Sequence, residues 1–151
     1  MAHAQDYLAL MQVRMGARLH VQMDIAPELH EVPLPPMLVQ PLIENAIKHG
    51  LDPLPEGGVL YIRAFRDGEM LTIEVQDSGQ GYAALADPSR HPGQGFGLQC
   101  IHERLLASYG KAGSLHLTGA RRASDPPHVA SGTTATLRLP LRPLNWATAC
   151  A

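Results

Sequence analysis

The stretch Leu42–Gly50 reads LIENAIKHG, and it carries two different faces if it is helical. Four apolar residues recur at helical spacing and predict a face packed against a core. They are Leu42, Ile43, Ala46 and Ile47. A common polar side is expected to carry Asn45, Lys48 and His49, because Lys48 and His49 follow Asn45 by three and four positions. An amide, an ammonium and an imidazole there suit a metal–phosphate group, although a solvated surface face is an equally good interpretation of these nine residues alone.

The composition is that of a globular domain and excludes several classes of protein. The 151 residues are 45% hydrophobic and 17% charged, which fits one domain with one core rather than a disordered chain. A net charge of −2 and 5% aromatic residues give no general reason to bind nucleic acid or an anionic membrane. The distant pair Cys100 and Cys150 indicates a reducing compartment without a disulfide framework.

The sequence shows no apolar stretch of membrane-spanning length and no signal-peptide pattern. Its abrupt start, MAHAQDYLAL, suggests an excised fragment in which Met1 was added, and an upstream region could hold membrane or sensor segments.

Hydrophobic periodicity predicts three helices and five strands. The expected helices are Gln5–Leu19, a segment from Pro35 or Pro36 to about His49, and Leu98–Tyr109. The expected strands are Leu19–Ile25, Val59–Arg66, Met70–Gln76, Ser114–Thr118 and Thr133–Leu139. The short connection Asp67–Glu69 indicates a hairpin, and Pro41 inside the second helix is expected to remove a hydrogen bond. This order predicts a two-layer α/β sandwich, in which a mixed, largely antiparallel sheet packs against about three helices.

The stretch Asp77–Gly81, DSGQG, directly follows a predicted strand. A buried carboxylate at Asp77 could accept a hydrogen bond from the amino group of adenine, whereas guanine presents an acceptor at that position. An unpaired carboxylate facing guanine would cost about 1–3 kcal/mol. Glycines beside the carboxylate suit a pocket wall made of backbone, but Asp and Gly are also the usual residues of a turn.

Two further stretches have weak signals of their own. Gly93–Leu98, GQGFGL, ends a long glycine-rich loop and opens a helix, where free backbone amides bind phosphate. It is neither a Rossmann fingerprint nor a Walker loop, because the preceding strand and the following Lys-Ser/Thr are missing, and a flexible hinge is the alternative. Ser131–Thr134, SGTT, could line an adenine pocket through a water, or form an ordinary turn.

Four stretches, in their order and separation, resemble the four boxes of the Bergerat ATP-binding fold: LIENAIKHG, DSGQG, GQGFGL and SGTTATLRLP. Gyrase, MutL proteins, a heat-shock chaperone and sensor histidine kinases share this fold. LPPMLVQPLIENAIKHGL and GLQCIHERLLASYG are similar to LytS-type sensor histidine kinases in particular. The resemblance covers about Tyr7 to Pro140. It implies an ATP-binding catalytic domain at residues 20–142, after the end of a dimerisation or linker helix at 1–19 and before a tail at 143–151.

The resemblance also implies roles for individual residues. Asn45 would hold the Mg²⁺ that bridges the phosphates of ATP, since Mg²⁺ needs few protein ligands. Asp77 would receive the adenine amine. The other implied nucleotide contacts are Lys48, His49, Gly79, Gly81, Gly93, Gly95, Gly97, Leu98, Thr133 and Thr134, and Arg90 is added for its charge alone.

The chain departs from the wider family at two places near Asn45. Pro41 stands where gyrase-like ATPases have a glutamate that activates water, so weak intrinsic hydrolysis is expected. Glu44 joins Asn45 and Lys48 as a candidate catalytic residue, although neighbouring helix positions diverge by about 100° and point Glu44 elsewhere or to the site edge. Cys100 stands where the family often has asparagine.

No histidine of the chain lies in the family's phosphoacceptor motif, so the chain is expected to bind ATP without phosphorylating itself. The implied partners are its own phosphoacceptor-histidine dimerisation domain, a response regulator and a second copy of the full-length protein, without nucleic acid. The domain would be cytoplasmic and the full protein anchored in the bacterial inner membrane. The alternatives are an ATP hydrolase or serine/threonine protein kinase on the same fold, and an interaction module that binds no nucleotide.

Overall fold

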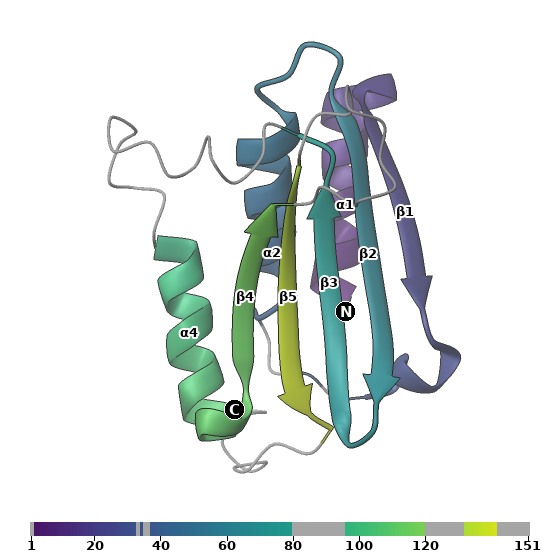
Figure 1. The fold of residues 1–151 in the computed structure, drawn as a ribbon. Helices are drawn as coiled ribbons and strands as arrows, with labels where there is room; N and C mark the ends of the chain where they lie inside the picture. Colours follow the sequence, from purple (N-terminus) through teal and green to yellow (C-terminus); the bar gives the residue numbers. More distant parts are fainter. Residues whose placement is uncertain (1, 33, 35–36, 80–95, 120–131, 142–151) are drawn as a thin grey trace.

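The computed structural model describes residues 2–32, 34, 37–79, 96–119 and 132–141 (Figure 1). These residues form one five-stranded mixed sheet, and three α-helices make up the second layer. The prediction of a two-layer α/β sandwich is therefore confirmed.

The sheet has the strand order β1-β2-β3-β5-β4. Its strands are β1 (Leu19–Ile25), β2 (Gly58–Asp67), β3 (Met70–Asp77), β4 (Ser114–Gly119) and β5 (Thr133–Pro140). Strand β1 runs parallel to β2, and the other three neighbouring pairs are antiparallel. All five predicted strands are present, and β1 has the predicted bounds.

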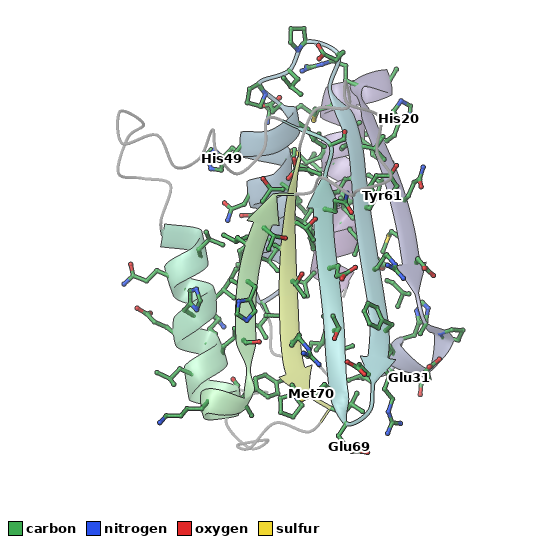
Figure 2. All side chains as sticks on the ribbon, in the orientation of Figure 1. His20, Glu31, His49, Tyr61, Glu69 and Met70 are labelled. Atoms are coloured by element: carbon green, nitrogen blue, oxygen red, sulfur yellow. The ribbon has the colours of Figure 1, made fainter. Side chains whose placement is uncertain are left out.

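The predicted hairpin joins β2 to β3 through Gly68 and Glu69, because Asp67 and Met70 are already paired. Gly68 has φ = 63°, which is typical of the first central residue of a type II′ turn. This turn, marked by Glu69 and Met70 in Figure 2, lies at the end of the sheet opposite His49.

The first helix, α1 (Ala2–Met15), ends four residues before the predicted Leu19. Gly16 has φ = 57°, a backbone conformation that glycine tolerates and that breaks an α-helix. The short 3-10 turn η1 (Gly16–Arg18) then leads the chain directly into β1.

The second helix differs most from its prediction. Helix α2 (Gln40–Asn45) starts about five residues later than expected, and it continues as a π-helix, η3 (Ala46–Leu51). Pro41 lies in the first turn of α2, where its missing N–H is not needed. The expected loss of a hydrogen bond at Pro41 is therefore wrong.

The third helix, α4 (Phe96–Tyr109), starts two residues before its predicted position and ends at the predicted residue. The 3-10 turn η5 (Gly110–Ala112) follows it, and another 3-10 turn, η2 (Pro27–Leu29), follows β1. No helix among the described residues combines the length and the apolar character needed to cross a bilayer.

The core lies between the sheet and the helices. In the sheet, Ile62 pairs with Val75 and Val75 with Ala135, so apolar side chains form a continuous row across three strands. From the helical layer, Ile43 and Ile47 are each 1% exposed. The apolar face predicted for LIENAIKHG is confirmed, since Leu42 and Ala46 are also buried. Burial of such side chains, at about 1.5–3 kcal/mol each, is what fixes this segment against the sheet.

Candidate functional site

Asp77, the last residue of β3, is a buried carboxylate with 3% of its surface exposed. Its Oδ1 accepts a hydrogen bond from the Gly79 N–H at 2.9 Å. Burial raises the pKa of Asp77, while backbone N–H groups of Gly79, Thr133 and Asp77 itself act in the opposite direction. A carboxylate that is buried and held by backbone donors is typical of a ligand-binding site. The carboxylate of an ordinary surface turn would be exposed.

Three glycines enclose Asp77 from segments far apart in the sequence. A Cβ atom at Gly50, in η3, would lie 2.5 Å from Asp77 Oδ1. At Gly79 it would lie 2.1 Å from the Gly50 carbonyl oxygen, and at Gly132, just before β5, 1.6 Å from the Asp77 carbonyl oxygen. Side chains are thus excluded at all three positions, and three of the four predicted boxes meet around Asp77.

Gly50 and Gly132 were not among the predicted site residues. Gly50 ends the stretch LIENAIKHG, and Gly132 lies in SGTT, a stretch that also suits an ordinary turn. The available signal was a glycine inside each of two boxes, because a residue packed this closely on Asp77 has to lack a side chain.

The strand register separates the two threonines of the last box. Thr134 pairs with Gln76, and Ala135 with Val75, so the next position along β5, Thr133, lies beside Asp77. Side chains alternate between the two faces of a strand. Thr133, 8% exposed, therefore shares the face of Asp77, whereas the half-buried side chain of Thr134 lies on the other face.

Asn45, Lys48 and His49 lie at the junction between α2 and the π-helix. Asn45 is half-buried, Lys48 is exposed and His49 is half-buried. Figure 2 shows His49 projecting from η3 toward the side of the molecule on which α4 lies. The π-helix is closed by the Asp52 N–H, which donates to the Ile47 carbonyl at 2.8 Å. Single π-helical turns are rare and occur frequently at functional sites.

The neighbours of Glu44 lie toward α1. Its Oε1 accepts a hydrogen bond from Gln40 Nε2 at 2.8 Å, within α2. Burial, and after it the negative charge of Glu44, raise the pKa of Tyr7 on α1. These contacts agree with the expected divergence of Glu44 from Asn45, and a catalytic role for Glu44 stays a prediction.

Four of the predicted nucleotide contacts, Gly81, Arg90, Gly93 and Gly95, lie outside the described residues. Gly97 is in the first turn of α4, and Leu98 is half-buried against the core. The predicted placement of this box at a helix start is therefore confirmed for its last three residues, Phe96–Leu98. Cys100, further along α4, is an exposed free cysteine.

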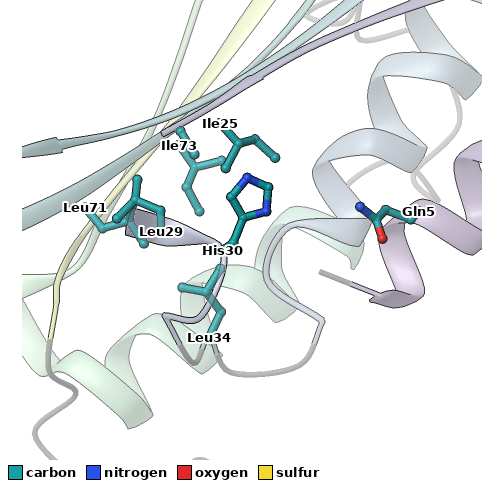
Figure 3. A pocket seen from close by; sticks show the side chains of 8 residues that line it. Gln5, Ile25, Leu29, His30, Leu34, Leu71 and Ile73 are labelled. Atoms are coloured by element: carbon teal, nitrogen blue, oxygen red, sulfur yellow. The ribbon is translucent and has the colours of Figure 1, made fainter. Parts of the chain in front are cut away.

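Within the ranges that the structure describes, no three His, Cys, Asp or Glu side chains are grouped so that they could hold a metal ion. A small apolar pocket lies at the other end of the sheet, near the start of β3 (Figure 3). It is lined by Gln5, Ile25, Leu29, His30, Leu34, Ala64, Leu71 and Ile73. None of the predicted site residues takes part in it.

Comparison with known proteins identifies the family of the chain. A family model described as "Histidine kinase-, DNA gyrase B-, and HSP90-like ATPase" matches residues 34–143. The chain belongs to this ATPase family, as its four boxes predicted.

Similar proteins include sensor histidine kinases and proteins named as sensor proteins. The chain is 34% identical to the sensor histidine kinase BtsS of Escherichia coli K12 over 140 residues, which cover 93% of this chain and 23% of BtsS. It is 28% identical to the sensor protein LytS of Oceanobacillus iheyensis over 131 residues, or 81% of this chain and 22% of LytS. The chain thus spans less than a quarter of the length of either relative.

Solved structures have the same fold at lower identity. The mycobacterial sensor histidine kinase MprB aligns over 93% of both chains with a TM-score of 0.62 and 22% identity. The catalytic domain of the histidine kinase ThkA, in a nucleotide-free form, aligns over 93% of this chain and 92% of its own with a TM-score of 0.64 and 14% identity.

Proposed function

We propose that this chain is the ATP-binding catalytic part of a bacterial sensor histidine kinase. It would hold Mg-ATP so that the γ-phosphoryl group faces a histidine on a dimerisation domain outside the chain, from which a response regulator is then phosphorylated. The observation that carries the proposal is the buried carboxylate of Asp77, which lies against the Gly50 backbone and accepts a hydrogen bond from the Gly79 N–H.

Asp77 would select the purine. An ionised carboxylate offers about four acceptor positions, so it can accept from the adenine amino group in addition to the Gly79 N–H. Guanine would set an oxygen against that carboxylate and leave a buried charge unpaired. Thr133 lies on the same face beside Asp77, so its hydroxyl is the better candidate of the two threonines for a contact near adenine.

The polar residues of the α2–η3 junction would hold the phosphate end. The Asn45 amide oxygen is a hard ligand of the kind that Mg²⁺ accepts, and Mg²⁺ takes its other ligands from phosphates and water. When bound, Mg²⁺ neutralises negative charge on the phosphates. Lys48, which is exposed, and His49 supply further donors on the same segment. The residues Gly81, Arg90, Gly93, Gly95, Gly97 and Leu98 would complete this end of the site.

Catalysis in such a site depends on position and charge rather than on a protein nucleophile. Pro41, buried in the first turn of α2, supplies no base for water. The other carboxylate nearby, Glu44, bonds to Gln40. These features favour a kinase that passes its phosphoryl group to a protein over a steady ATP hydrolase. A second copy of the full-length protein and an inner-membrane anchor belong to the same proposal.

The test is titration calorimetry of this chain with the non-hydrolysable analogues Mg·AMP-PNP and Mg·GMP-PNP. We expect binding of the adenine analogue and a preference over the guanine analogue of about tenfold or more. Equal affinities for the two analogues would contradict the proposed role of Asp77 in selecting adenine. A failure to bind either analogue at millimolar concentration would favour the interaction module instead. Sustained phosphate release from ATP by the chain would favour the hydrolase.

A further inference from the structure

Asp52 is the C-cap residue directly after the π-helix η3, and two arginines from the N-terminal elements bind it. Arg14, in the last turn of α1, forms an ion pair with the Asp52 carboxylate at 3.0 Å. Arg18, in η1, donates from Nη2 to the Asp52 carbonyl oxygen at 3.0 Å and to the Leu54 carbonyl oxygen at 2.5 Å. The residue that terminates η3 is thus bound both through its side chain and through its backbone.

The contact around Arg18 is close and specific. Gly57, with φ = 67°, packs against the Arg18 backbone, and a Cβ atom there would lie 2.0 Å from the Arg18 carbonyl oxygen. Among the described residues, Arg18 Nε is a buried nitrogen without a hydrogen-bond partner. Such a group is costly, so the side chain is held in this place by the two bonds that its Nη2 atom makes.

Asp52 connects these arginines to the proposed nucleotide site through the π-helix. Its N–H closes the last π-type bond to the Ile47 carbonyl at 2.8 Å. In an ordinary α-helix the same N–H would bond to Lys48, one residue later. That change would rotate the residues of η3 and move Gly50 away from the Asp77 carboxylate, against which it is packed.

We propose that Arg18, assisted by Arg14, is a positioning residue that keeps η3 in its π-helical form and thereby sets the spacing between Asn45, Gly50 and Asp77. Movement of α1 relative to the sheet would act on nucleotide affinity through the same contacts. The inference rests on the proposed function, because it concerns the regulation of that site.

The test compares Arg18→Lys with Arg66→Lys. A lysine keeps the charge, but its ammonium lies one bond nearer the backbone than the Nη2 atom that bonds to both carbonyls, so it cannot reach them from the same place. Arg66 is the matched control, because it likewise donates to a backbone carbonyl, that of Gly68 at 2.6 Å, and to the Glu69 carboxylate at 3.2 Å, at the other end of the sheet. Both variants and the parent are measured by amide hydrogen exchange without nucleotide, and by calorimetry with Mg·AMP-PNP.

For Arg18→Lys we expect exchange to accelerate by about tenfold in a peptide covering residues 46–54, and not in the β2–β3 hairpin. We also expect the Kd for Mg·AMP-PNP to rise by about five- to tenfold, with Arg66→Lys like the parent in both measurements. Unchanged exchange, acceleration across the whole sheet, or an unchanged Kd despite local acceleration would each overturn the proposal. A parent chain that does not bind AMP-PNP would instead refute the proposed function, while the exchange experiment would still report on the arginine contacts.

Discussion

The backbone of Gly50 lies directly against the carboxylate of Asp77, so close that a methyl group on Gly50 would be 2.5 Å from Oδ1. In sequence, β2 and the rest of β3 lie between the two residues. Their contact joins the segment proposed to hold the phosphates to the residue proposed to hold the base. The geometry of the site therefore depends on an interface that has no room for a side chain.

Gly50→Ala tests that interface. The added methyl group has to displace the Asp77 carboxylate or move η3, and overpacking of this kind costs about 1–3 kcal/mol. We expect the Kd for Mg·AMP-PNP to rise by about tenfold or more, as measured by calorimetry. Gly119→Ala is the control, because nothing lies within 4 Å of a Cβ atom there. Equal affinity of the two variants would show that the contact does not shape the site.

Asp77→Asn tests base selection. An amide can donate to the oxygen of guanine as well as accept from adenine, so we expect the preference for AMP-PNP over GMP-PNP to fall by about tenfold or more. The exposed Asp24→Asn, on the opposite face of the sheet, should keep the preference of the parent. If Asp77→Asn discriminates as well as the parent does, another residue reads the base.

The pH dependence of stability provides an independent test of Asp77. Its pKa is raised in the folded chain, chiefly by burial, so folding favours the protonated carboxyl. The stability from this preference is fully present below the unfolded pKa of about 3.9. It is lost as the pH rises through the folded pKa. We expect urea unfolding of the nucleotide-free parent, measured relative to Asp77→Asn, to show this decrease. A difference that is flat or rises with pH would contradict the burial argument.

Asn45→Ala tests the metal contact. Removal of the amide oxygen should leave binding of AMP-PNP in EDTA nearly unchanged and reduce the gain in affinity that Mg²⁺ produces by about tenfold. The control is Gln12→Ala, which removes an exposed amide from α1. An undiminished effect of Mg²⁺ in Asn45→Ala would assign the metal to other groups.

Gly132→Ala tests the third glycine through stability. Its Cβ atom would lie 1.6 Å from the Asp77 carbonyl oxygen, a backbone atom that cannot turn aside as a side chain can. We expect the free energy of unfolding to fall by about 3 kcal/mol or more, measured by urea denaturation, with Gly119→Ala again as the comparison. A stability close to that of Gly119→Ala would mean that β5 can shift without cost.

The sequence predicted the strands well because each has its own periodic pattern. Leu19–Ile25 alternates along its whole length, and the β2–β3 turn carries a glycine where positive φ is needed. The helical spacing of apolar residues predicted the buried face of Leu42–Ile47 equally well. These features are local, so propensity and pattern determine them without knowledge of the rest of the chain.

The features that the sequence did not predict depend on contacts between distant segments. Nothing in AIKHGL distinguishes a π-helix from an α-helix, because the bond that closes the π-helix comes from Asp52, outside this stretch. Pro41 was interpreted as an interior residue, since the helix start at Gln40 has no side-chain cap to mark it. The enclosure of Asp77 by Gly50 and Gly132 arises from packing of segments that are far apart in sequence.

The parallel pairing of β1 with β2 bears on how the chain folds. Residues of the β2–β3 hairpin meet across a two-residue turn, whereas Leu19 and its partner Gly58 are separated in sequence by α2 and η3. Closing that large loop delays the pairing, and contacts of long sequence separation slow folding in general. We infer that the hairpin forms early and that β1 joins it late, bringing α1 with it, so the N-terminal arm is the part of the molecule that opens first in native-state fluctuations.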